Sequence, residues 1–527
     1  MNRFQLSFLA PARHTYAPGV GDLLRMATGV VFVLLATGPA YATLLRAASA
    51  AIQPIALDFG ETTVYAGTLR ILSGEPLYQP IAGPPYTVTP YTPLYHYVAA
   101  ALRAVFGEGF GPGRVLSLLA GLATALIIGL LAARAVRAVW VGAFAAVLFL
   151  ALAFPGGTPW LGLYRVDSLG VALSVSAIAA LSLGNGSRAS LVAGILAGLA
   201  ILCKQTFVAA LAAGVVWQWT ERPRLIAFVS AAALVVGLPC LWLQLSTGVF
   251  AQNVLSPLNP FDATIARRLI GEFVAVQWLP ILLTVACFCF RPWERPAERL
   301  LFIYWLASSL QLIGLAKVGS NHNYILEFAA ASAMLGALGA YRLLHLPRPE
   351  LSVVAAVALL VVLRLVFGGG FAQVAFGGLG AIRTERTEVA ADISMVRAGS
   401  DDPEFDSLVK RVREEPGIVM ADPPDVTVLA DRPVYFEPLI YSVLMAEGQW
   451  QPARAVNTIC SGQVTLLVLG YELGGHSDAY GSFDAFPDPV TRALEQVMSY
   501  AWSQANRNVY TLRSGFDLAS TRSTGAC

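Results

Sequence analysis

The sequence predicts a polytopic α-helical membrane domain that is followed by a small α/β domain. Of its 527 residues, 56% are hydrophobic and only 13% are charged, whereas soluble globular chains carry about 25% charged residues. The mean hydropathy is +0.63. Long apolar runs alternate with short basic turns up to residue 368, and the remaining sequence has mixed polarity. Such alternation is typical of a chain that crosses a membrane many times.

The first apolar run is expected to be a retained membrane span. It follows a polar and basic segment, MNRFQLSFLAPARHTYAPGVGDLLR. The run is too long for a removable signal peptide and lacks the small-residue cleavage site that such a peptide needs. In total we expect about eleven spans, although several runs are shorter than the roughly 20 residues of a full span. They lie near 24–49, 112–133, 138–154, 167–183, 189–203, 206–219, 224–246, 268–290, 300–316, 324–344 and 351–368.

The run TPLYHYVAAALRAVF at 92–106 is too short to cross a bilayer. About 15 residues at about 1.5 Å each reach about 22 Å, against a hydrocarbon core of about 30 Å. We therefore expect this run to lie along, or partly in, the outer surface of the membrane. It then belongs to a first outer loop at 50–111.

With this placement, the basic turns all fall on the side of the N-terminus. They hold Arg134, Arg137, Arg188, Arg222, Arg224, Arg291, Arg295, Arg299, Arg342 and Arg348. Because Lys and Arg accumulate in cytoplasmic loops, this side is expected to face the cytoplasm. The first outer loop and the whole C-terminus then lie on the extracytoplasmic side of a bacterial cytoplasmic (inner) membrane.

The segment 189–219 allows two topologies. It forms either a hairpin that is broken at Lys204 and Gln205 or one long tilted helix, which would reverse the orientation of everything downstream. Arg222 and Arg224 favour the hairpin, because it brings them to the basic side.

We divide the chain into a membrane domain at 1–368 and an extracytoplasmic α/β domain at 369–527. In the second domain the runs GIVMA, RPVYF and VTLLVLG are bounded by Asp, Pro and Gly, which predicts strands. The segments SLVKRVREEP and PVTRALEQVMSYAW have helical spacing. Cys460 and Cys527 could form a disulfide in an exported domain, but we expect them to stay unpaired.

Composition argues against several functional classes. The net charge of +2 shows no basic excess for binding nucleic acid. The six cysteines lack CxxC or Cys/His ligand spacing, so structural zinc is not expected. No other cofactor is indicated.

Polar residues with possible chemical roles gather in the outer segments. Asp58 and Glu61 follow the first span, and carboxylates beside a membrane are functional candidates because protein or water must solvate them. A G-x-x-L-Y motif comes next, then YTPLY at 91–95, and Arg165-x-Asp167 heads a later span. In this order the motifs resemble the GT-C superfamily of membrane glycosyltransferases, over roughly residues 24–340. The nearest resemblance is to bacterial family 39-like proteins, related to protein O-mannosyltransferases and aminoarabinose lipid A transferases, or to family 87.

This resemblance implies a glycosyltransferase (hexosyl or pentosyl) that uses a polyprenyl-monophosphate sugar as donor. Its partners would be that donor, membrane lipids and a lipid, glycan or protein acceptor. A first-loop Asp would act as general base on the acceptor hydroxyl, in a cavity that opens to the extracytoplasmic side, and Asp58 matches this Asp. Glu61 is the second catalytic candidate, although the family often has Asp and Glu adjacent, whereas Phe59 and Gly60 separate them here.

The chemistry of glycosyl transfer requires a base and a group that stabilises the leaving phosphate. Arg or Lys stabilises a monophosphate without a metal, and no D-x-D motif at an outer turn suggests a metal site. The candidates for binding donor phosphate or substrate are Arg165, Asp167, Lys204, Lys317, Asn321, Asn323, Tyr324 and Glu327. The last four resemble an NY-x-x-E stretch in related sequences.

Each candidate also has a structural interpretation. Asp58 could cap the helix expected at 60–73, and Glu61 could be a first-turn acid favoured by the helix dipole. Arg165 and Asp167 could be a structural pair, and Lys317 could reach toward lipid headgroups.

Two other functional classes fit parts of the pattern. A secondary transporter or flippase would also need charged residues in its membrane domain, but repeated halves are absent from the sequence. An O-antigen ligase or polymerase-type enzyme would depend on a late outer loop, whereas the acidic pair here is early.

Overall fold

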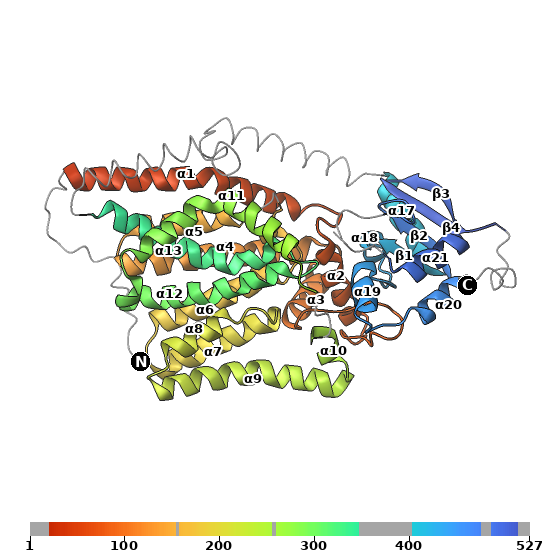
Figure 1. Ribbon diagram of the computed structural model, residues 1–527, viewed down its shortest axis with the longest axis horizontal. Helices are drawn as coiled ribbons and strands as arrows, with labels where there is room; N and C mark the ends of the chain where they lie inside the picture. Colours follow the sequence, from red (N-terminus) through yellow and green to blue (C-terminus); the bar gives the residue numbers. More distant parts are fainter. Residues whose placement is uncertain (1–19, 154–157, 256–259, 347–402, 476–485, 515–526) are drawn as a thin grey trace.

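A computed structural model describes residues 20–153, 158–255, 260–346, 403–475, 486–514 and 527. Its larger part is a bundle of helices, and an α/β domain lies against one end of this bundle (Figure 1). The span expected at 351–368 lies outside the described residues. The domain boundary expected at 368 also lies there and stays a prediction.

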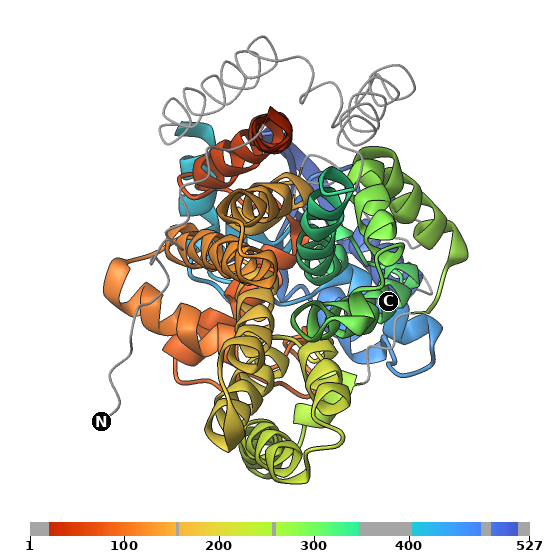
Figure 2. The same ribbon diagram turned by 90° about the vertical axis from the view of Figure 1, so that its left-hand side faces the viewer.

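The bundle is organised around one central helix, α13 (Leu326–Leu344). In the most apolar stretch of the segment His322–Leu344, which contains this helix, 89% is buried inside the protein. In the most apolar stretch of α9 (Arg222–Thr247) only 17% is buried. Its sequence is rich in Ala and Gly, and small residues let neighbouring helices approach closely. Figure 2, which looks from the end opposite the α/β domain, shows the helices nearly end-on around this centre. The other bundle helices are α1 (Val20–Ala50), α4 (Gly111–Val136), α5 (Val139–Leu152), α6 (Asp167–Leu183), α7 (Gly186–Cys203), α8 (Ala209–Trp217), α11 (Ala263–Phe288) and α12 (Pro296–Ser309).

Six helical segments among the described residues are long and apolar enough to cross a membrane. They are Arg25–Ala50, Gly111–Val136, Gly186–Cys203, Arg222–Thr247, Pro296–Ala316 and His322–Leu344. The apolar helices α5 and α6 are shorter. The predicted polytopic helical membrane domain is therefore confirmed, and the count of eleven spans stays a prediction.

Ring contacts bring the basic turns to one end of the bundle. Trp140, at the start of α5, lies 6.1 Å from the ring of Tyr341 near the end of α13. The guanidinium of Arg299 lies 5.0 Å from the ring of Trp217, the last residue of α8. Arg342, near the end of α13, also pairs with Glu298 at the start of α12. These contacts place the turns before α5, α9 and α12 and after α13 together, as the charge pattern predicts.

The segment 189–219 is a hairpin. Helix α7 ends at Cys203 and α8 begins at Ala209. Ser190, near the start of α7, donates a hydrogen bond to Gln218, just past the end of α8. The two helices are therefore antiparallel, and the predicted break at Lys204 is confirmed.

The opposite end of the bundle carries short elements. They are α2 (Phe59–Leu72), α3 (Leu94–Phe106), α10 (Phe250–Leu255) and the 3₁₀ segments η3 (Trp160–Gly162), η5 (Leu310–Ala316) and η6 (His322–Ile325). Helix α3 contains the run that is too short to span, and it lies beside α2 at this end (Figure 1). Its exposed tip is apolar, with Val105 and Phe106 each more than 70% exposed.

The α/β domain contains a four-stranded sheet of order β1-β2-β4-β3, in which β1 and β2 are parallel and the other neighbours are antiparallel. The strands are β1 (Ile418–Asp422), β2 (Val464–Leu469), β3 (Met498–Gln504) and β4 (Arg507–Leu512). The helices are α17 (Pro403–Glu414), α18 (Asp425–Leu429), α19 (Pro438–Ala446), α20 (Ala453–Cys460) and α21 (Asp488–Val497). The predicted strands GIVMA and VTLLVLG and the helix over SLVKRVREEP are thus correct.

Two predicted elements of this domain are wrong. The helix expected over PVTRALEQVMSYAW ends at Val497, and MSYAW forms the start of β3. Its aromatic residues suit a strand, and the Ala505-Asn506 turn, in which both residues have positive φ, closes a tight hairpin to β4. The run RPVYF is outside the sheet. It instead makes a parallel bridge between Phe436 and Tyr86 of the first outer loop.

The first outer loop is built into the core of the α/β domain. The backbone N–H of Tyr86 donates to Tyr435 O at 2.7 Å, and that of Glu437 donates to Tyr86 O at 2.9 Å. Tyr86 is buried among aromatic side chains of the domain, including Tyr441 and Trp450. The loop and the domain therefore share one hydrophobic cluster, which fixes the domain over this end of the bundle.

The expectation that Cys460 and Cys527 stay free is wrong. The two residues form a disulfide, with their Cα atoms 5.6 Å apart. Sequence separation does not reveal this proximity, which depends on where the last residue returns against α20. Cys203, Cys240, Cys287 and Cys289 are free.

Candidate functional site

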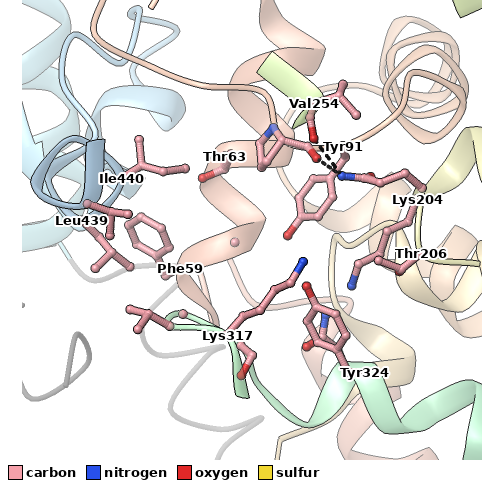
Figure 3. A pocket seen from close by; sticks show the side chains of 18 of the residues that line it. Phe59, Thr63, Tyr91, Lys204, Thr206, Val254, Lys317, Tyr324, Leu439 and Ile440 are labelled. Atoms are coloured by element: carbon pink, nitrogen blue, oxygen red, sulfur yellow. Dashed lines mark hydrogen bonds between the residues drawn. The ribbon is translucent and has the colours of Figure 1, made fainter. Parts of the chain in front are cut away.

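A cavity of about 290 Å³ lies where the membrane bundle, the first outer loop and the α/β domain meet. Its lining comes from α2, the YTPLY segment, the break after α7, α10, the turn after η5, and α19. Figure 3 shows Lys204, Thr206 and Tyr324 on one side and Phe59, Leu439 and Ile440 on the other, with the Lys317 side chain reaching in from below. Segments that are far apart in the sequence therefore build a single site.

Asp58 is the N-cap of α2 and directly precedes Phe59 and Gly60, which line this cavity. Its extended backbone (φ −148°, ψ 142°) lets Oδ2 accept the backbone N–H of Gly60 at 2.9 Å, which is the usual N-cap bond. The same oxygen accepts from Arg165 Nη1 at 2.5 Å. The capping interpretation of Asp58 is therefore correct, and it coexists with a charged contact at the cavity.

Glycine at position 60 makes room for this contact. A Cβ atom at Gly60 would overlap Arg165 Nη1 and would come within 3.1 Å of Asp58 Oδ2. Gly60 and Phe59 both line the cavity, so the start of α2 forms part of its wall. Only a residue without a side chain leaves the guanidinium in place.

Arg165 and Lys204 are held by the buried carboxylate of Asp167. Arg165 Nε lies 3.5 Å from Asp167 Oδ2, and Lys204 Nζ donates to Asp167 Oδ1 at 2.9 Å. Asn323 Nδ2 also donates to Asp167 Oδ1, at 3.0 Å. Burial alone would lower the pKa of Arg165, but Tyr91 and the carboxylates of Asp58 and Asp167 raise this pKa well above its ordinary value. The guanidinium therefore stays charged.

Aromatic rings complete the polar side of the cavity. The Lys204 ammonium lies 3.9 Å from the ring centroid of Tyr324 and 5.9 Å from that of Tyr91. The hydroxyl of Tyr91 accepts a hydrogen bond from Arg165 Nη2 at 3.2 Å. These contacts orient the two buried cations toward the cavity at little cost, because rings stabilise cations through their faces.

Lys317 differs from the other two cations. It lines the cavity and is half-buried, and its backbone is fixed by an antiparallel bridge to Phe261. No carboxylate of the described residues forms an ion pair with its ammonium. In contrast, Arg165 pairs with Asp58 and Asp167, and Lys204 pairs with Asp167. The cluster of Asp58, Asp167 and the three cations therefore has one positive charge in excess.

Glu61, the second catalytic candidate, lies outside the lining of the cavity. Its side chain is fully buried and lies in an ion pair with Arg114 at 2.6 Å. It also accepts the backbone N–H groups of Leu57 and Tyr164, while Arg114 donates to backbone carbonyls of the first outer loop. Because every hydrogen bond of this carboxylate joins segments of the protein, Glu61 holds the loop and is not part of the cavity.

Two further predicted binding residues lie apart from the cavity. Asn321 is an exposed N-cap whose side chain accepts from the backbone N–H of His322. Glu327 is buried one turn below Asn323 and accepts hydrogen bonds from Ser174, Tyr304 and Gln311. The remaining predicted binding residues, Arg165, Asp167, Lys204, Lys317, Asn323 and Tyr324, come together at the site.

The α/β domain was expected over the mouth of the cavity, with a part in choosing the acceptor, but the sequence did not identify which of its residues line the cavity. Glu437, Leu439, Ile440 and Val443 line the cavity. Glu437 is one carboxylate among many in a mixed-polarity region, and no local pattern marks it. Tyr91 lies in the YTPLY motif, so that motif pointed to the site without identifying the residue's role.

The fold resembles solved membrane-protein structures. The structure of ArnT from Cupriavidus metallidurans bound to undecaprenyl phosphate matches with a TM-score of 0.58 and 14% identity, covering 94% of this chain and 98% of that chain. The apo state of the same protein matches with a TM-score of 0.58 and 15% identity, covering 92% and 98%. The oligosaccharyltransferase of Archaeoglobus fulgidus in the apo form is less similar, with a TM-score of 0.49 and 13% identity, covering 92% of this chain and 74% of that chain. No protein-family model and no curated protein sequence match the chain.

The match to ArnT extends over nearly the whole of both chains. It therefore includes the α/β domain as well as the helical bundle. The chain has a membrane fold of the GT-C type, as the motif order predicted.

Proposed function

We propose that the protein is a membrane glycosyltransferase that moves one sugar from a polyprenyl-monophosphate donor to an acceptor outside the cytoplasm. The observation that carries this proposal is the cluster at the cavity, where Asp58 pairs with Arg165, and Arg165, Lys204 and Lys317 line one cavity at the end of an apolar bundle. The resemblance of the fold to ArnT, whose structure contains undecaprenyl phosphate, supports the donor class. The sugar is a hexosyl or pentosyl group.

The three cations bind and stabilise the donor phosphate in this proposal. A departing sugar leaves negative charge on the phosphate, and fixed cations in a site with little water stabilise that charge strongly. Lys317 has the charge that no carboxylate of the described residues compensates, so we assign it the closest contact with the phosphate. Arg165 and Lys204 are already held in position by Asp167 and add further positive charge beside the phosphate.

Asp58 acts as the general base on the acceptor. Its Oδ2 takes both of the hydrogen bonds described above, which leaves Oδ1 for a ligand at the cavity edge. The Arg165 guanidinium orients the carboxylate through its hydrogen bond to Oδ2. The proton of the acceptor hydroxyl moves to Asp58 as the oxygen attacks the sugar carbon.

The cavity and the α/β domain face the extracytoplasmic side. The basic turns at the opposite end of the bundle support this orientation by the positive-inside rule. The disulfide between Cys460 and Cys527 supports it independently, because disulfides persist in oxidising compartments. We place the protein in a bacterial cytoplasmic membrane on this basis.

Substitution Asp58→Asn tests the role of the base. The amide keeps the N-cap bond and nearly the same shape but cannot take a proton, so turnover should fall by about 10²–10⁴-fold. Transfer from a panel of undecaprenyl-phosphate sugars is measured with purified protein, and binding of undecaprenyl phosphate serves as the control for an intact fold. Near-normal turnover of the variant would contradict the assignment.

Activity should not require a divalent metal. The guanidinium of Arg165 pairs with both Asp58 and Asp167 and so occupies the space in which these two carboxylates would hold a metal ion. We expect transfer to continue unchanged in excess EDTA. Loss of transfer that magnesium or manganese restores would show that the donor site has been assigned incorrectly.

A further inference from the structure

We propose that the α/β domain supplies the acceptor half of the cavity and that Glu437 is its specificity-determining residue. This inference rests on the proposed glycosyl transfer and names the chemistry of the acceptor. It predicts a molecule with a hydroxyl or amino group on a partly apolar body.

The cavity has two chemically different halves. Arg165, Lys204 and Lys317 give one half its positive charge. The other half is apolar, with Leu439, Ile440 and Val443 of α19 facing Phe59 of α2, and Figure 3 shows Leu439, Ile440 and Phe59 across from Lys204 and Tyr324. A phosphate belongs in the first half, so the second half is available for the other substrate.

Glu437 is the single carboxylate among the described residues that line the cavity. It is 2% exposed and precedes the first turn of α19. Its Oε2 accepts the backbone N–H of Val88 at 2.9 Å, and its side chain also hydrogen-bonds Thr63, which lines the cavity on α2. Glu437 and Thr63 thus form a polar pair at the edge of the apolar half.

The backbone around Glu437 is fixed relative to α2. Backbone hydrogen bonds join Tyr86 of the first outer loop to Tyr435 and Glu437 of the domain. Tyr441 donates from its hydroxyl to Ile81 O at 3.0 Å, one turn further along α19. A substrate group bound by Glu437 would therefore be held in a constant position relative to Asp58 at the start of α2.

Glu437 is a buried carboxylate beside the apolar wall of the cavity. Burial raises its pKa above the ordinary value, while Val88 N–H, Arg70 and Thr63 oppose this shift. Arg70 is buried on α2 and donates to Thr87 and to Leu77 O, without a close ion pair among the described residues. A carboxylate here disfavours an anionic group and favours a hydrogen-bond donor, which excludes the phosphate and suits a hydroxyl or amine.

Substitution Glu437→Gln tests this assignment through the Michaelis constants. Gln keeps an acceptor for Val88 N–H but has no charge, so the apparent KM for the acceptor should rise about tenfold, the typical loss of one charge-assisted hydrogen bond. The KM for the undecaprenyl-phosphate sugar should change less than about twofold. Lys317→Gln should show the opposite pattern, because it belongs to the cationic half.

The acceptor probe is a lipid and glycan extract from the envelope of the source cells. It is separated into a chloroform–methanol fraction and an aqueous fraction, and acceptor activity is expected in the former because of the apolar wall. Asp425→Asn is the matched control. It removes the charge of another buried carboxylate of the same domain. Asp425 pairs with Arg507 at a distance of 2.9 Å, and neither residue lines the cavity. Ile440→Thr is a second test that leaves Glu437 intact and should raise only the acceptor KM.

The outcomes separate the two proposals. An acceptor KM that stays constant in Glu437→Gln and Ile440→Thr, with an active wild type, overturns the acceptor assignment and leaves the proposed function intact. If acceptor activity is found only in the aqueous fraction, the proposal that the acceptor has a partly apolar body is wrong. A wild type that transfers no sugar from any donor of the panel removes the proposed function and this inference with it.

Discussion

Asp58 and Glu61 show how neighbouring carboxylates acquire different roles. They are three residues apart at the start of α2, yet Asp58 is partly exposed and pairs with the cavity-lining Arg165, whereas Glu61 is fully buried against Arg114. Local sequence predicts similar structural roles for both, Asp58 as the cap of a helix and Glu61 as an acid in its first turn. The difference comes from the partners that other segments bring, because Arg114 comes from α4 and Arg165 from the turn before α6.

Gly60→Ala is predicted to separate folding from activity. The new Cβ would overlap the guanidinium of Arg165, which is the flexible end of a side chain and can move away. The protein should therefore fold, with a change in stability of about 1 kcal/mol or less, but Asp58 should lose its ion pair and transfer should fall at least about tenfold. Turnover and thermal unfolding are measured together. Gly237→Ala on α9, where a Cβ meets nothing within 4 Å, is the control, and equal activity of both variants would refute the role of Gly60.

At the scale of elements, α2 and α3 pack through a buried histidine. His96 Nδ1 lies 3.2 Å from Val64 O, and its ring lies against Gly67 of α2. The pKa of His96 is lowered to about 4, because burial and the nearby Arg70 outweigh the opposing bond to Val64 O. His96 is therefore neutral in the folded protein and acts in packing.

This environment predicts a specific loss of stability in acid. The folded pKa of about 4 lies below the ordinary value of 6.5, so the unfolded chain binds the proton first and stability falls as the pH drops from 6.5 toward 4. The loss should reach about 3 kcal/mol. Thermal unfolding of the purified protein at several pH values measures it. In His96→Asn, whose amide N–H can still reach Val64 O, this pH dependence should be reduced, and an identical slope in both proteins would argue against it.

At the scale of the whole molecule, the site depends on which ends of the helices meet. The hairpin of α7 and α8 brings Lys204 to the same end as Asp58, and one continuous helix there would have placed Lys317 at the other end. The shared core of the first outer loop and the α/β domain then closes the cavity from above.

Labelling in intact cells tests the orientation of the molecule. A variant without Cys203, Cys240 and Cys287 retains the exposed Cys289 near the basic end and the disulfide. A membrane-impermeant maleimide should leave Cys289 unmodified but should modify a new cysteine in Ala82→Cys, which is exposed in the first outer loop. Permeabilised cells provide the control in which Cys289 reacts. Labelling of Cys289 in intact cells, without labelling at position 82, would reverse the proposed orientation.

The sequence by itself determined the class of fold, the grouping of basic turns at one end and the position of the short run at 92–106. These features depend on local composition and periodicity, which act within each segment. It also indicated Asp58, Arg165, Asp167, Lys204 and Lys317, because charged residues beside apolar runs are costly without a role. Only the tertiary structure decided that Glu61 is buried against Arg114, that Glu437 lines the cavity and that Cys460 meets Cys527. Each of these depends on a contact between distant segments, which no local pattern encodes.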